Sequence, residues 1–444
     1  MWPWRNRRLK LLLVSLAWLC SVGWLYWYIT REKEDIRGAV PELLWWTNDM
    51  NWAYDEMRYC NLESCRVTNN RQRLKEARGI LFYGSNMKPH DFPMPREPHH
   101  LWGLLHEESP RNVPFVPHRE FLQHFNNTST FSRHSNLPLT TQYLPHPSDL
   151  TQTDYYIPHY SKQVIQFNER LASVVFLQTD CNTLSGREDY VQELMQHIPV
   201  DSYGGCLRNR DLPESLQKDY LNNLYSDALL RFLSRYKFMI AIENGICDDY
   251  ITEKYWRPLI MGVIPIYFGS PSIREWQPHN KSAIYIDDFA NAGALAAHLQ
   301  QLDNNETAYK SYLDHKLKRD KPVDNALLLN HLLTRRYQMN HEQQNEEQSL
   351  FHKFECLMCR QAMSTVKLRS ANGQHYSCPL PPVHAPLERH KEPKYASDWR
   401  SMMNVGRCQA LLLDAYFRSN FRYTKAKFEA QLAEMVEQNL CNQA

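Results

Sequence analysis

The sequence predicts an α/β fold, and three observations support that prediction. Between residues 172 and 303, apolar runs of strand length alternate with stretches of helical length, an order typical of a parallel sheet wound in Rossmann fashion. The 444 residues leave room for two or three domains, each large enough to bury a core. Hydrophobic residues make up 43% and charged residues 23%, the balance of a chain that folds, and the net charge of +2 does not favour nucleic acid as a partner.

The predicted elements follow in chain order. Residues 41–46, 79–85 and 100–108 are apolar runs of strand length between polar or proline-rich loops, and they predict one α/β domain over residues 41–165. A second domain is predicted over residues 166–335, with strands at 172–178, 200–204, 237–244, 263–269 and 283–289 and helices at 190–198, 229–236, 252–262 and 294–303. Residues 336–444 are predicted to form a cysteine-containing C-terminal extension or packed arm, with a helix over 419–439.

The N-terminus predicts a membrane anchor. Residues Leu11–Ile29 form nineteen residues without a charge, enough for a helix to cross roughly 30 Å of hydrocarbon. Basic residues precede this run, so residues 1–10 are expected in the cytosol, 11–29 in the membrane and 30–40 in a stem, with the rest in the Golgi or ER lumen. A cleaved signal peptide is the competing interpretation, but bulky aromatic residues end the run where cleavage needs small ones.

The cysteine content supports a location of residues 41–444 in the Golgi or ER lumen. Of the 11 cysteines, all but Cys20 lie outside the predicted anchor, which leaves an even number for disulfides. Cys356 and Cys359 form a C-x-x-C that is compatible with half a zinc site, but the chain has no second C-x-x-C, so disulfides are favoured. The candidate glycosylation sites are the sequons at Asn126, Asn127, Asn280 and Asn305.

The stretch from Phe238 to Ser270 carries the most informative motif. A predicted strand ends at Glu243-Asn244, and a predicted helix opens near Thr252-Glu253, the arrangement at which doubly wound folds bind nucleotides. Lys254 offers a positive charge to phosphate, and Glu253 offers a carboxylate to ribose hydroxyls. A nucleoside diphosphate sugar suits such a site. The alternative is that both residues are ordinary surface charges of a first helical turn.

The same stretch resembles a known family. FMIAIENGICDDYITEK and GVIPIYFGS are similar to the signature of the α1,3-fucosyltransferases, and weaker similarity runs from about Leu43 to Cys359. HEESP, STFSRHS, LPLTTQYL, VDSYG-x-C and FEC-x-x-C resemble the animal subgroup called fucosyltransferases ten and eleven. The resemblance implies two Rossmann-like domains facing across a cleft, of the GT-B type, with GDP-fucose bound in the C-terminal domain and fucose transferred with inversion.

The resemblance also implies roles for individual residues. Asn244, Tyr250, Glu253 and Lys254 match donor-binding positions, and Arg187 matches an arginine that steadies the pyrophosphate. Positive side chains are suited to a leaving diphosphate, and Glu253 is able to accept from ribose or fucose hydroxyls.

The general base that inversion requires is expected in the N-terminal domain. The family's E-S-P element matches HEESP here, which makes Glu108 the predicted catalytic base. Glu107 and His106 are adjacent rivals. Because successive side chains of a strand diverge, Glu107 and Glu108 are not expected to aim at the same place.

On the acceptor side, the segment FNNTSTFSRHS keeps Arg133 and Ser135 of the family pattern. It has Ser132, His134 and Asn136 where Lewis-type members carry charged residues, which places the usual N-acetyllactosamine acceptor in doubt.

Two further expectations concern metals and disulfides. The chain has no D-x-D, so we expect transfer without a metal and with no cofactor beyond the donor substrate GDP-fucose. The resemblance implies cross-links from Cys60 and Cys65 to Cys356 and Cys359, and one pairing is expected among Cys181, Cys206 and Cys247.

The predicted activity is α1,3-fucosylation of a glycan or glycoprotein acceptor by a single-pass type II membrane protein. Two alternatives remain open: transfer to Ser or Thr of a folded protein domain, and a catalytically silent lumenal binding protein.

Overall fold

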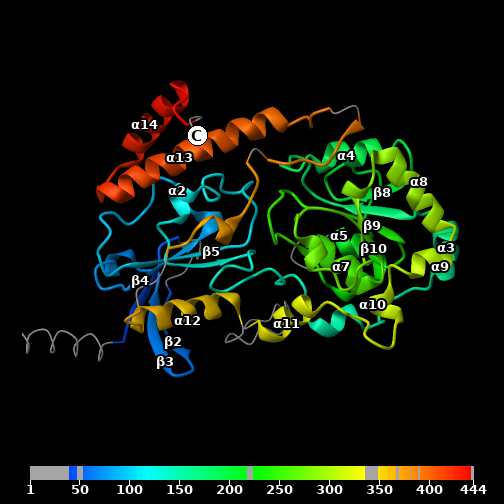
Figure 1. The fold of residues 1–444 in the computed structure, drawn as a ribbon, viewed down its shortest axis with the longest axis horizontal. Helices are drawn as coiled ribbons and strands as arrows, with labels where there is room; N and C mark the ends of the chain where they lie inside the picture. Colours follow the sequence, from blue (N-terminus) through cyan, green and yellow to red (C-terminus); the bar gives the residue numbers. More distant parts are fainter. Residues whose placement is uncertain are drawn as a thin grey trace, which may run out of the picture.

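The computed structural model describes residues 40–47, 54–217, 224–335, 349–366, 370–380, 382–388 and 391–441. Two sheets lie side by side, each flanked by helices (Figure 1). The predicted cytosolic tail and anchor, and all but the last residue of the stem, lie outside the described residues. No helix in the described ranges combines the length and the apolar character that crossing a membrane requires.

The first sheet has six strands in the order β2-β3-β1-β4-β5-β6. Their bounds are β1 Glu42–Trp45, β2 Asp55–Cys60, β3 Glu63–Thr68, β4 Gly79–Tyr83, β5 Leu101–His106 and β6 Asn127–Thr130. Only the β2–β3 pair is antiparallel. The runs predicted as strands at 41–46, 79–85 and 100–108 are confirmed as β1, β4 and β5.

The second sheet is fully parallel, in the order β11-β10-β9-β7-β8. Its strands are β7 Val174–Leu177, β8 Val200–Tyr203, β9 Phe238–Ile242, β10 Ile264–Phe268 and β11 Ile284–Tyr285. Its helices are α3 His159–Glu169, α4 Arg187–Leu194, α5 Glu214–Gln217, α6 Asp227–Leu233, α7 Glu253–Met261, α8 Ala292–Asp303, α9 Glu306–Lys310, α10 Asp314–Leu317 and α11 Ala326–Thr334. The predicted alternation of strands and helices is confirmed. β11 is shorter than expected because residues 286–288 turn into a 3₁₀ helix.

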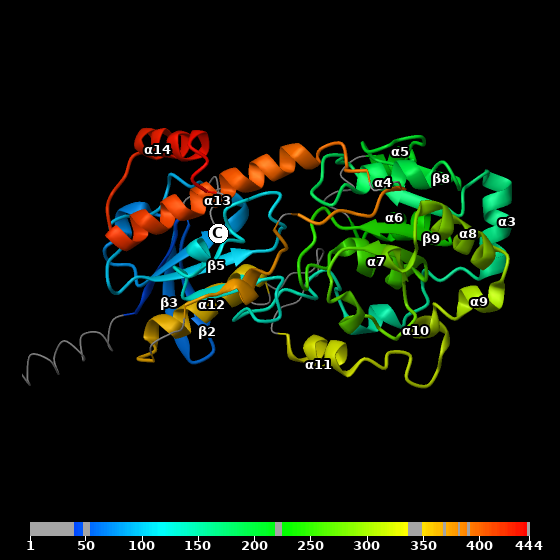
Figure 2. The same cartoon turned by 45° about the horizontal axis from the view of Figure 1, so that its top comes forward.

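The C-terminal part of the chain returns to the first sheet. Helix α12 Leu350–Met363 and helix α13 Ala396–Ser419 lie on opposite sides of it, as Figures 1 and 2 both show. α12 packs with Leu43, Leu81 and Leu105, whereas α13 packs with Ile80, Phe82 and Leu104. Alternate strand residues point to opposite faces, so each helix covers one face. Helices α12 and α13 of the predicted C-terminal extension therefore supply much of the first sheet's core.

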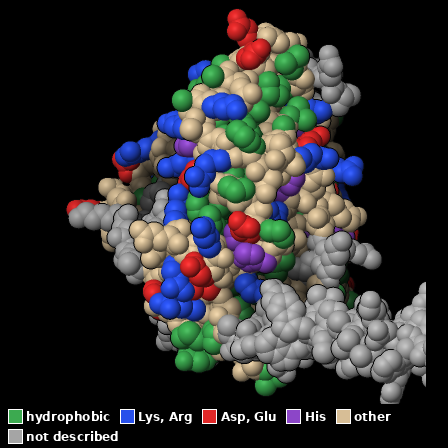
Figure 3. All heavy atoms as spheres, turned by 90° about the vertical axis from the view of Figure 1, so that its left-hand side faces the viewer, with side chains coloured by type: hydrophobic (Ala, Val, Ile, Leu, Met, Phe, Trp, Pro, Cys, Tyr) green, Lys and Arg blue, Asp and Glu red, His purple; other side chains and the backbone are tan. Residues whose placement is uncertain are grey.

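The helix predicted over residues 419–439 is partly wrong. α13 ends at Ser419, Asn420 adopts a left-handed conformation that ends it, and a separate helix, α14, spans Lys425–Glu437. The remaining helix, α2 Arg119–Leu122, packs against α13. Charged side chains of both signs are interspersed on the end of the molecule that the first sheet forms, in keeping with the small net charge (Figure 3).

Five disulfides hold this arrangement together: Cys60–Cys356, Cys65–Cys359, Cys181–Cys206, Cys247–Cys378 and Cys408–Cys441. The first two join the β2–β3 hairpin to α12, which confirms the pairing that the resemblance implied. The pairing expected among three cysteines near the donor site is Cys181–Cys206. The zinc alternative for Cys356 and Cys359 is wrong, because both sulfurs are consumed in disulfides.

The four sequons lie in different surroundings. Asn127 is fully buried in β6, where a glycan has no room, so this candidate is wrong. Asn126 accepts hydrogen bonds from Arg96 and from the main-chain nitrogen of Trp102. Asn280 and Asn305 are exposed and remain predictions.

Candidate active site

The strand order of the second sheet creates a topological switch point between β7 and β9. Open parallel sheets bind ligands at the carboxyl ends of the strands at such a point. The loop after β9 carries Glu243 and Asn244, and the loop after β7 leads to Arg187 at the start of α4. Predicted donor residues from two loops therefore meet where a nucleotide is expected.

The T-E-K motif forms a buried cluster rather than a solvated surface. Glu243 accepts hydrogen bonds from the main-chain nitrogen of Thr252 at 2.8 Å and from its hydroxyl at 2.7 Å, which fixes the first turn of α7. The Lys254 Nζ donates to Thr252 Oγ1 at 3.0 Å and to Glu253 Oε1 at 3.1 Å. The side chains of Lys254 and Glu253 are only 10% and 14% exposed, so the alternative of ordinary surface charges is wrong.

The charges of this cluster follow from its contacts. Burial alone raises the pKa of Glu253, but the positive charges of Lys254 and Arg257 and nearby hydrogen bonds outweigh it and lower the pKa below the usual value. Burial raises the pKa of Glu243, which Lys254 partly opposes. The charged form is therefore favoured more at Glu253 than at Glu243, and an ionised carboxylate is a strong acceptor for sugar hydroxyls.

Arg187 is 3% exposed and lies under the same loops. Its Nη1 donates to the main-chain oxygen of Ile242 at 3.3 Å and its Nη2 to that of Asp180 at 3.0 Å, while its Nε has no hydrogen-bond partner among the described residues. Burial lowers the pKa of Arg187, and neighbouring carboxylates oppose that effect. A buried, incompletely satisfied guanidinium at a switch point is suited to bind an anion.

Glu108, two residues beyond β5, reaches this donor cluster from the first sheet. The Tyr250 hydroxyl donates to Asn244 Oδ1 at 3.1 Å and to Glu108 Oε2 at 3.3 Å. The two loops approach closely, since a Cβ atom on Gly245 would lie 2.9 Å from the Cβ of Ser109. Burial raises the pKa of Glu108, Glu253 adds to the increase, and Lys254 opposes it.

The rivals of Glu108 face elsewhere. Glu107 accepts from the Tyr83 hydroxyl at 2.9 Å, on the side of β4, so the two glutamates diverge as predicted. The His106 ring is fully buried and stacks on Tyr376, with 5.4 Å between ring centres. Burial lowers the pKa of His106 to about 3. An enclosed neutral imidazole is a poor proton acceptor, which leaves Glu108 as the better-placed base.

The structure places the predicted acceptor residues in internal contacts. The Arg133 guanidinium donates to Asp249 through Nε and Nη2 and to Glu275 through Nη1 at 2.6 Å, so it ties the first sheet to the second. The Ser135 hydroxyl bonds to that of Thr130 at 2.7 Å. Neither residue contacts Glu108 in these bonds, and their acceptor role remains a prediction.

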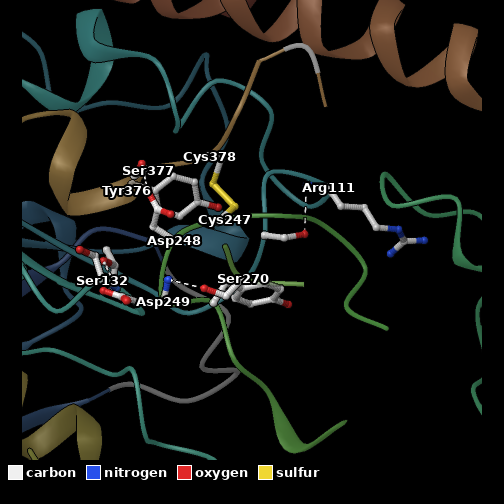
Figure 4. The surroundings of a disulfide bond; sticks show 12 residues. Arg111, Ser132, Cys247, Asp248, Asp249, Ser270, Tyr376, Ser377 and Cys378 are labelled. Atoms are coloured by element: carbon white, nitrogen blue, oxygen red, sulfur yellow. Dashed lines mark hydrogen bonds between the residues drawn. A yellow bond between two sulfur atoms is a disulfide. The ribbon is translucent and has the colours of Figure 1, made fainter. Parts of the chain in front are cut away.

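Two contributors to this region were not predicted. Tyr376 donates from its hydroxyl to the main-chain oxygen of Glu108 at 2.6 Å. Cys247 pairs with Cys378, and this disulfide joins the donor loop to the C-terminal segment (Figure 4). The even number of cysteines implied some partner for Cys247. No local pattern in the sequence points to Tyr376, because its contact depends on packing across 268 positions.

Family models match both halves of the chain. "Fucosyltransferase, N-terminal" matches residues 39–143, and "Glycosyltransferase family 10 (fucosyltransferase) C-term" matches residues 167–373. The chain belongs to glycosyltransferase family 10, the fucosyltransferases. The resemblance drawn from the E-N and T-E-K motifs is thereby confirmed, as is the prediction that the chain is a glycosyltransferase.

This family 10 member is similar to relatives that carry two different names. It is 55% identical over 434 residues to "Alpha-(1,3)-fucosyltransferase B" of Drosophila melanogaster, covering 97% of each chain. It is 37% identical over 411 residues to "GDP-fucose protein O-fucosyltransferase 3" of Homo sapiens, covering 90% of this chain and 84% of that one. A solved alpha1,3-fucosyltransferase with GDP superposes with a TM-score of 0.42 at 15% identity, over 74% of this chain and 93% of that chain. The family assignment rests on the sequence matches.

Proposed function

We propose that this fucosyltransferase transfers L-fucose from GDP-fucose to an acceptor hydroxyl with inversion, and that Glu108 is the general base. One observation carries the proposal: the Tyr250 hydroxyl joins Glu108 of the first sheet to Asn244 of the donor motif in the second. Inversion needs one base close to the donor sugar, on the side from which the acceptor attacks. Glu108 is the carboxylate that meets this requirement.

The surrounding charges suit the remaining steps of such a transfer. As the acceptor hydroxyl attacks the sugar carbon, its proton passes to Glu108, whose raised pKa makes its carboxylate a stronger base than that of an exposed glutamate. The bond from sugar to diphosphate breaks, and the electron pair leaves with GDP. Arg187 and Lys254 are positioned to stabilise that negative charge, and the start of α4, where no side chain caps the helix, adds main-chain N–H groups.

We further propose that the two sheets form a GT-B arrangement and that transfer is independent of metal. The chain has no D-x-D, and two buried cations, Arg187 and Lys254, take the role that a divalent ion has in many other glycosyltransferases. Location in the Golgi or ER membrane as a single-pass type II protein is proposed from the apolar run Leu11–Ile29.

For the acceptor, a glycan modified in α1,3 linkage is the first candidate. This candidate acceptor is supported by the relative from Drosophila melanogaster. The name of that protein states the α1,3 linkage, and its sequence is similar to this chain over nearly the whole length.

Transfer to Ser or Thr of a protein is the second candidate, favoured by two observations. Vertebrate relatives are named GDP-fucose protein O-fucosyltransferases. In addition, Ser132 donates to the main-chain oxygen of Gln374 and Arg133 pairs with Asp249, so these side chains of the acceptor segment are engaged within the protein. A silent binding protein is disfavoured because donor motif and base are assembled together.

Incubating the full chain in detergent with labelled GDP-fucose and a panel of glycans and folded protein domains tests the proposal. Mass analysis of the labelled product shows which atom gained the sugar, and thus decides between the two acceptor classes. Glu108→Gln should lose about 10²- to 10⁴-fold in turnover while binding GDP normally, whereas Lys254→Ala should weaken GDP binding as well as turnover. If Glu108→Gln retained full transfer activity, Glu108 would not be the general base.

A further inference from the structure

Residues 371–378, named here the bridge segment, contact both halves of the proposed active site. On the side of the first sheet, the main-chain nitrogen of Ala371 donates to Phe125 O at 2.9 Å, and the Ser132 hydroxyl donates to Gln374 O at 2.6 Å. On the side of the second sheet, the Ser377 hydroxyl donates to Asp248 Oδ2 at 2.6 Å, as Figure 4 illustrates. The bridge segment thus spans the boundary between the two sheets at the point where base and donor motif meet.

Tyr376 is the centre of this segment. Its side chain is 1% exposed, its ring lies 4.7 Å from that of Phe131, and its hydroxyl donates to the main-chain oxygen of Glu108 at 2.6 Å. Tyr250 holds the carboxylate of the same residue. Two tyrosines from distant parts of the chain therefore hold Glu108 by its main chain and by its side chain.

Both tyrosines belong to one cross-linked unit. Cys247, three residues before Tyr250, is joined to Cys378, two residues after Tyr376. The main-chain nitrogen of Asp248 also donates to Ser377 O at 2.8 Å. The position of Glu108 is consequently set against the donor loop as well as against its own strand.

We infer that Tyr376 is a positioning residue for the transfer, holding the main chain of Glu108 at the distance from the donor loop that attack requires. The inference rests on the proposed role of Glu108 as base. Base and donor sit on different sheets, and a shift of about 1 Å between reacting groups is enough to cost roughly 100-fold in rate. A hydrogen bond from a covalently tethered segment opposes that shift.

Tyr376→Phe tests this with the smallest change, because it removes the hydroxyl and keeps the buried ring. Its matched control is Tyr423→Phe, which also loses a hydroxyl bonded to a main-chain oxygen, that of Pro89 at 3.0 Å. We expect Tyr376→Phe to lower kcat by about 10- to 100-fold with GDP affinity and the KM for GDP-fucose within about twofold of the parent. Tyr423→Phe should leave all three unchanged, while thermal melting reports on folding.

A double substitution separates positioning from a general effect. If Tyr376 acts through Glu108, adding Tyr376→Phe to Glu108→Gln should cause no further loss of the residual transfer, measured in single turnovers. Equal losses in both backgrounds, or unchanged kcat in Tyr376→Phe, would overturn the inference. Full transfer by Glu108→Gln would overturn the base assignment together with it, so the two failures are distinguishable.

Ser377→Ala provides a second variant should Tyr376→Phe not fold. It removes the side-chain hydrogen bond from the bridge segment to Asp248, keeps the main-chain bond between Asp248 and Ser377, and leaves the tyrosine ring in place. The expected result is a smaller fall in kcat with GDP affinity retained, and unchanged kcat in a folded Ser377→Ala protein would then count against the inference.

Discussion

The two sheets share a strand order but obtain their helices in different ways. Without the antiparallel β2, the first sheet has the order β3-β1-β4-β5-β6, which matches β8-β7-β9-β10-β11 of the second when each is numbered along the chain. Helices α4, α6, α7 and α8 lie between or directly after the strands of the second sheet. The first sheet is instead covered by α12 and α13, and α12 begins at Leu350, 220 residues after β6 ends at Thr130.

This difference has a physical consequence for stability. A parallel sheet has to be covered on both faces, so the first sheet is incomplete until residues 350–419 have packed onto it. The second sheet is covered by helices that lie between or directly after its own strands in the chain. We therefore expect the first sheet to depend on long-range links, and the following changes test that dependence.

Removing residues 349–444 has the largest expected effect. Both faces of the first sheet lose their apolar cover, along with the disulfides to Cys60 and Cys65. We expect no folded protein, as judged by yield and by resistance to proteolysis. The control lacks only residues 421–444 and carries Cys408→Ser. It loses α14, whose only fully buried residue is Phe428, and should still fold. A protease-resistant first sheet in the longer deletion would contradict the comparison.

The two disulfides to α12 should be strongly non-additive. Their sequence separations are 296 and 294, so either one alone closes nearly the same loop in the unfolded chain. On the chain-entropy model, removing one bond opens only the loop of about ten residues between the two bonds and should cost about 3 kcal/mol, whereas removing both also opens the long loop and should cost about 8 kcal/mol. The short loop closed by Cys181–Cys206, with a separation of 25, is worth about 3 kcal/mol on the same model. Melting of the single and double serine variants measures these differences, and additive losses would refute the idea of a shared loop.

Phe354→Ala probes the cover of one face. Phe354 is fully buried against the first sheet, and its truncation should cost about 3 to 5 kcal/mol in the free energy of unfolding. Phe421→Ala is the control, since Phe421 is 55% exposed and should change stability by less than about 0.5 kcal/mol. Hydrogen exchange should show the loss of protection in β1 and β5 before β9. A uniform loss of exchange protection across both sheets would show instead that the two sheets unfold as one cooperative unit.

The smallest expected effect is a shift in pH dependence. The base from the first sheet, Glu108, has a raised pKa, whereas the carboxylate of the second, Glu253, has a lowered one. Glu108 must be deprotonated to act, so kcat/KM should be full above its pKa and fall as the pH drops through it. Because Lys254 lowers the pKa of Glu108, Lys254→Ala should move this acid limb to higher pH. Lys427→Ala, at an exposed position, should leave the acid limb in place. An acid limb that does not move in Lys254→Ala would show that Lys254 does not influence the pKa of Glu108.

Features whose signals are local could be predicted from the sequence. The strands of the second sheet and its helices α4, α6, α7 and α8 follow from apolar periodicity over a few residues, and the switch-point motif lies within Glu243 to Lys254. The bonds between Cys60 and Cys356 and between Cys65 and Cys359 were expected from family resemblance, which carries long-range information that periodicity lacks.

Which distant segments meet could not be predicted from local patterns and follows from the packing of the whole fold. Within residues 336–444 the sequence predicts a helix only over 419–439, and nothing in its local pattern says that α12 and α13 cover a sheet whose last strand ends at Thr130. The bond from Tyr376 to Glu108 and the disulfide from Cys247 to Cys378 likewise arise because two sheets and a returning segment pack together. Local pattern specifies the conformation of a segment, whereas the partner that buries it is chosen by shape and apolar area across the whole fold.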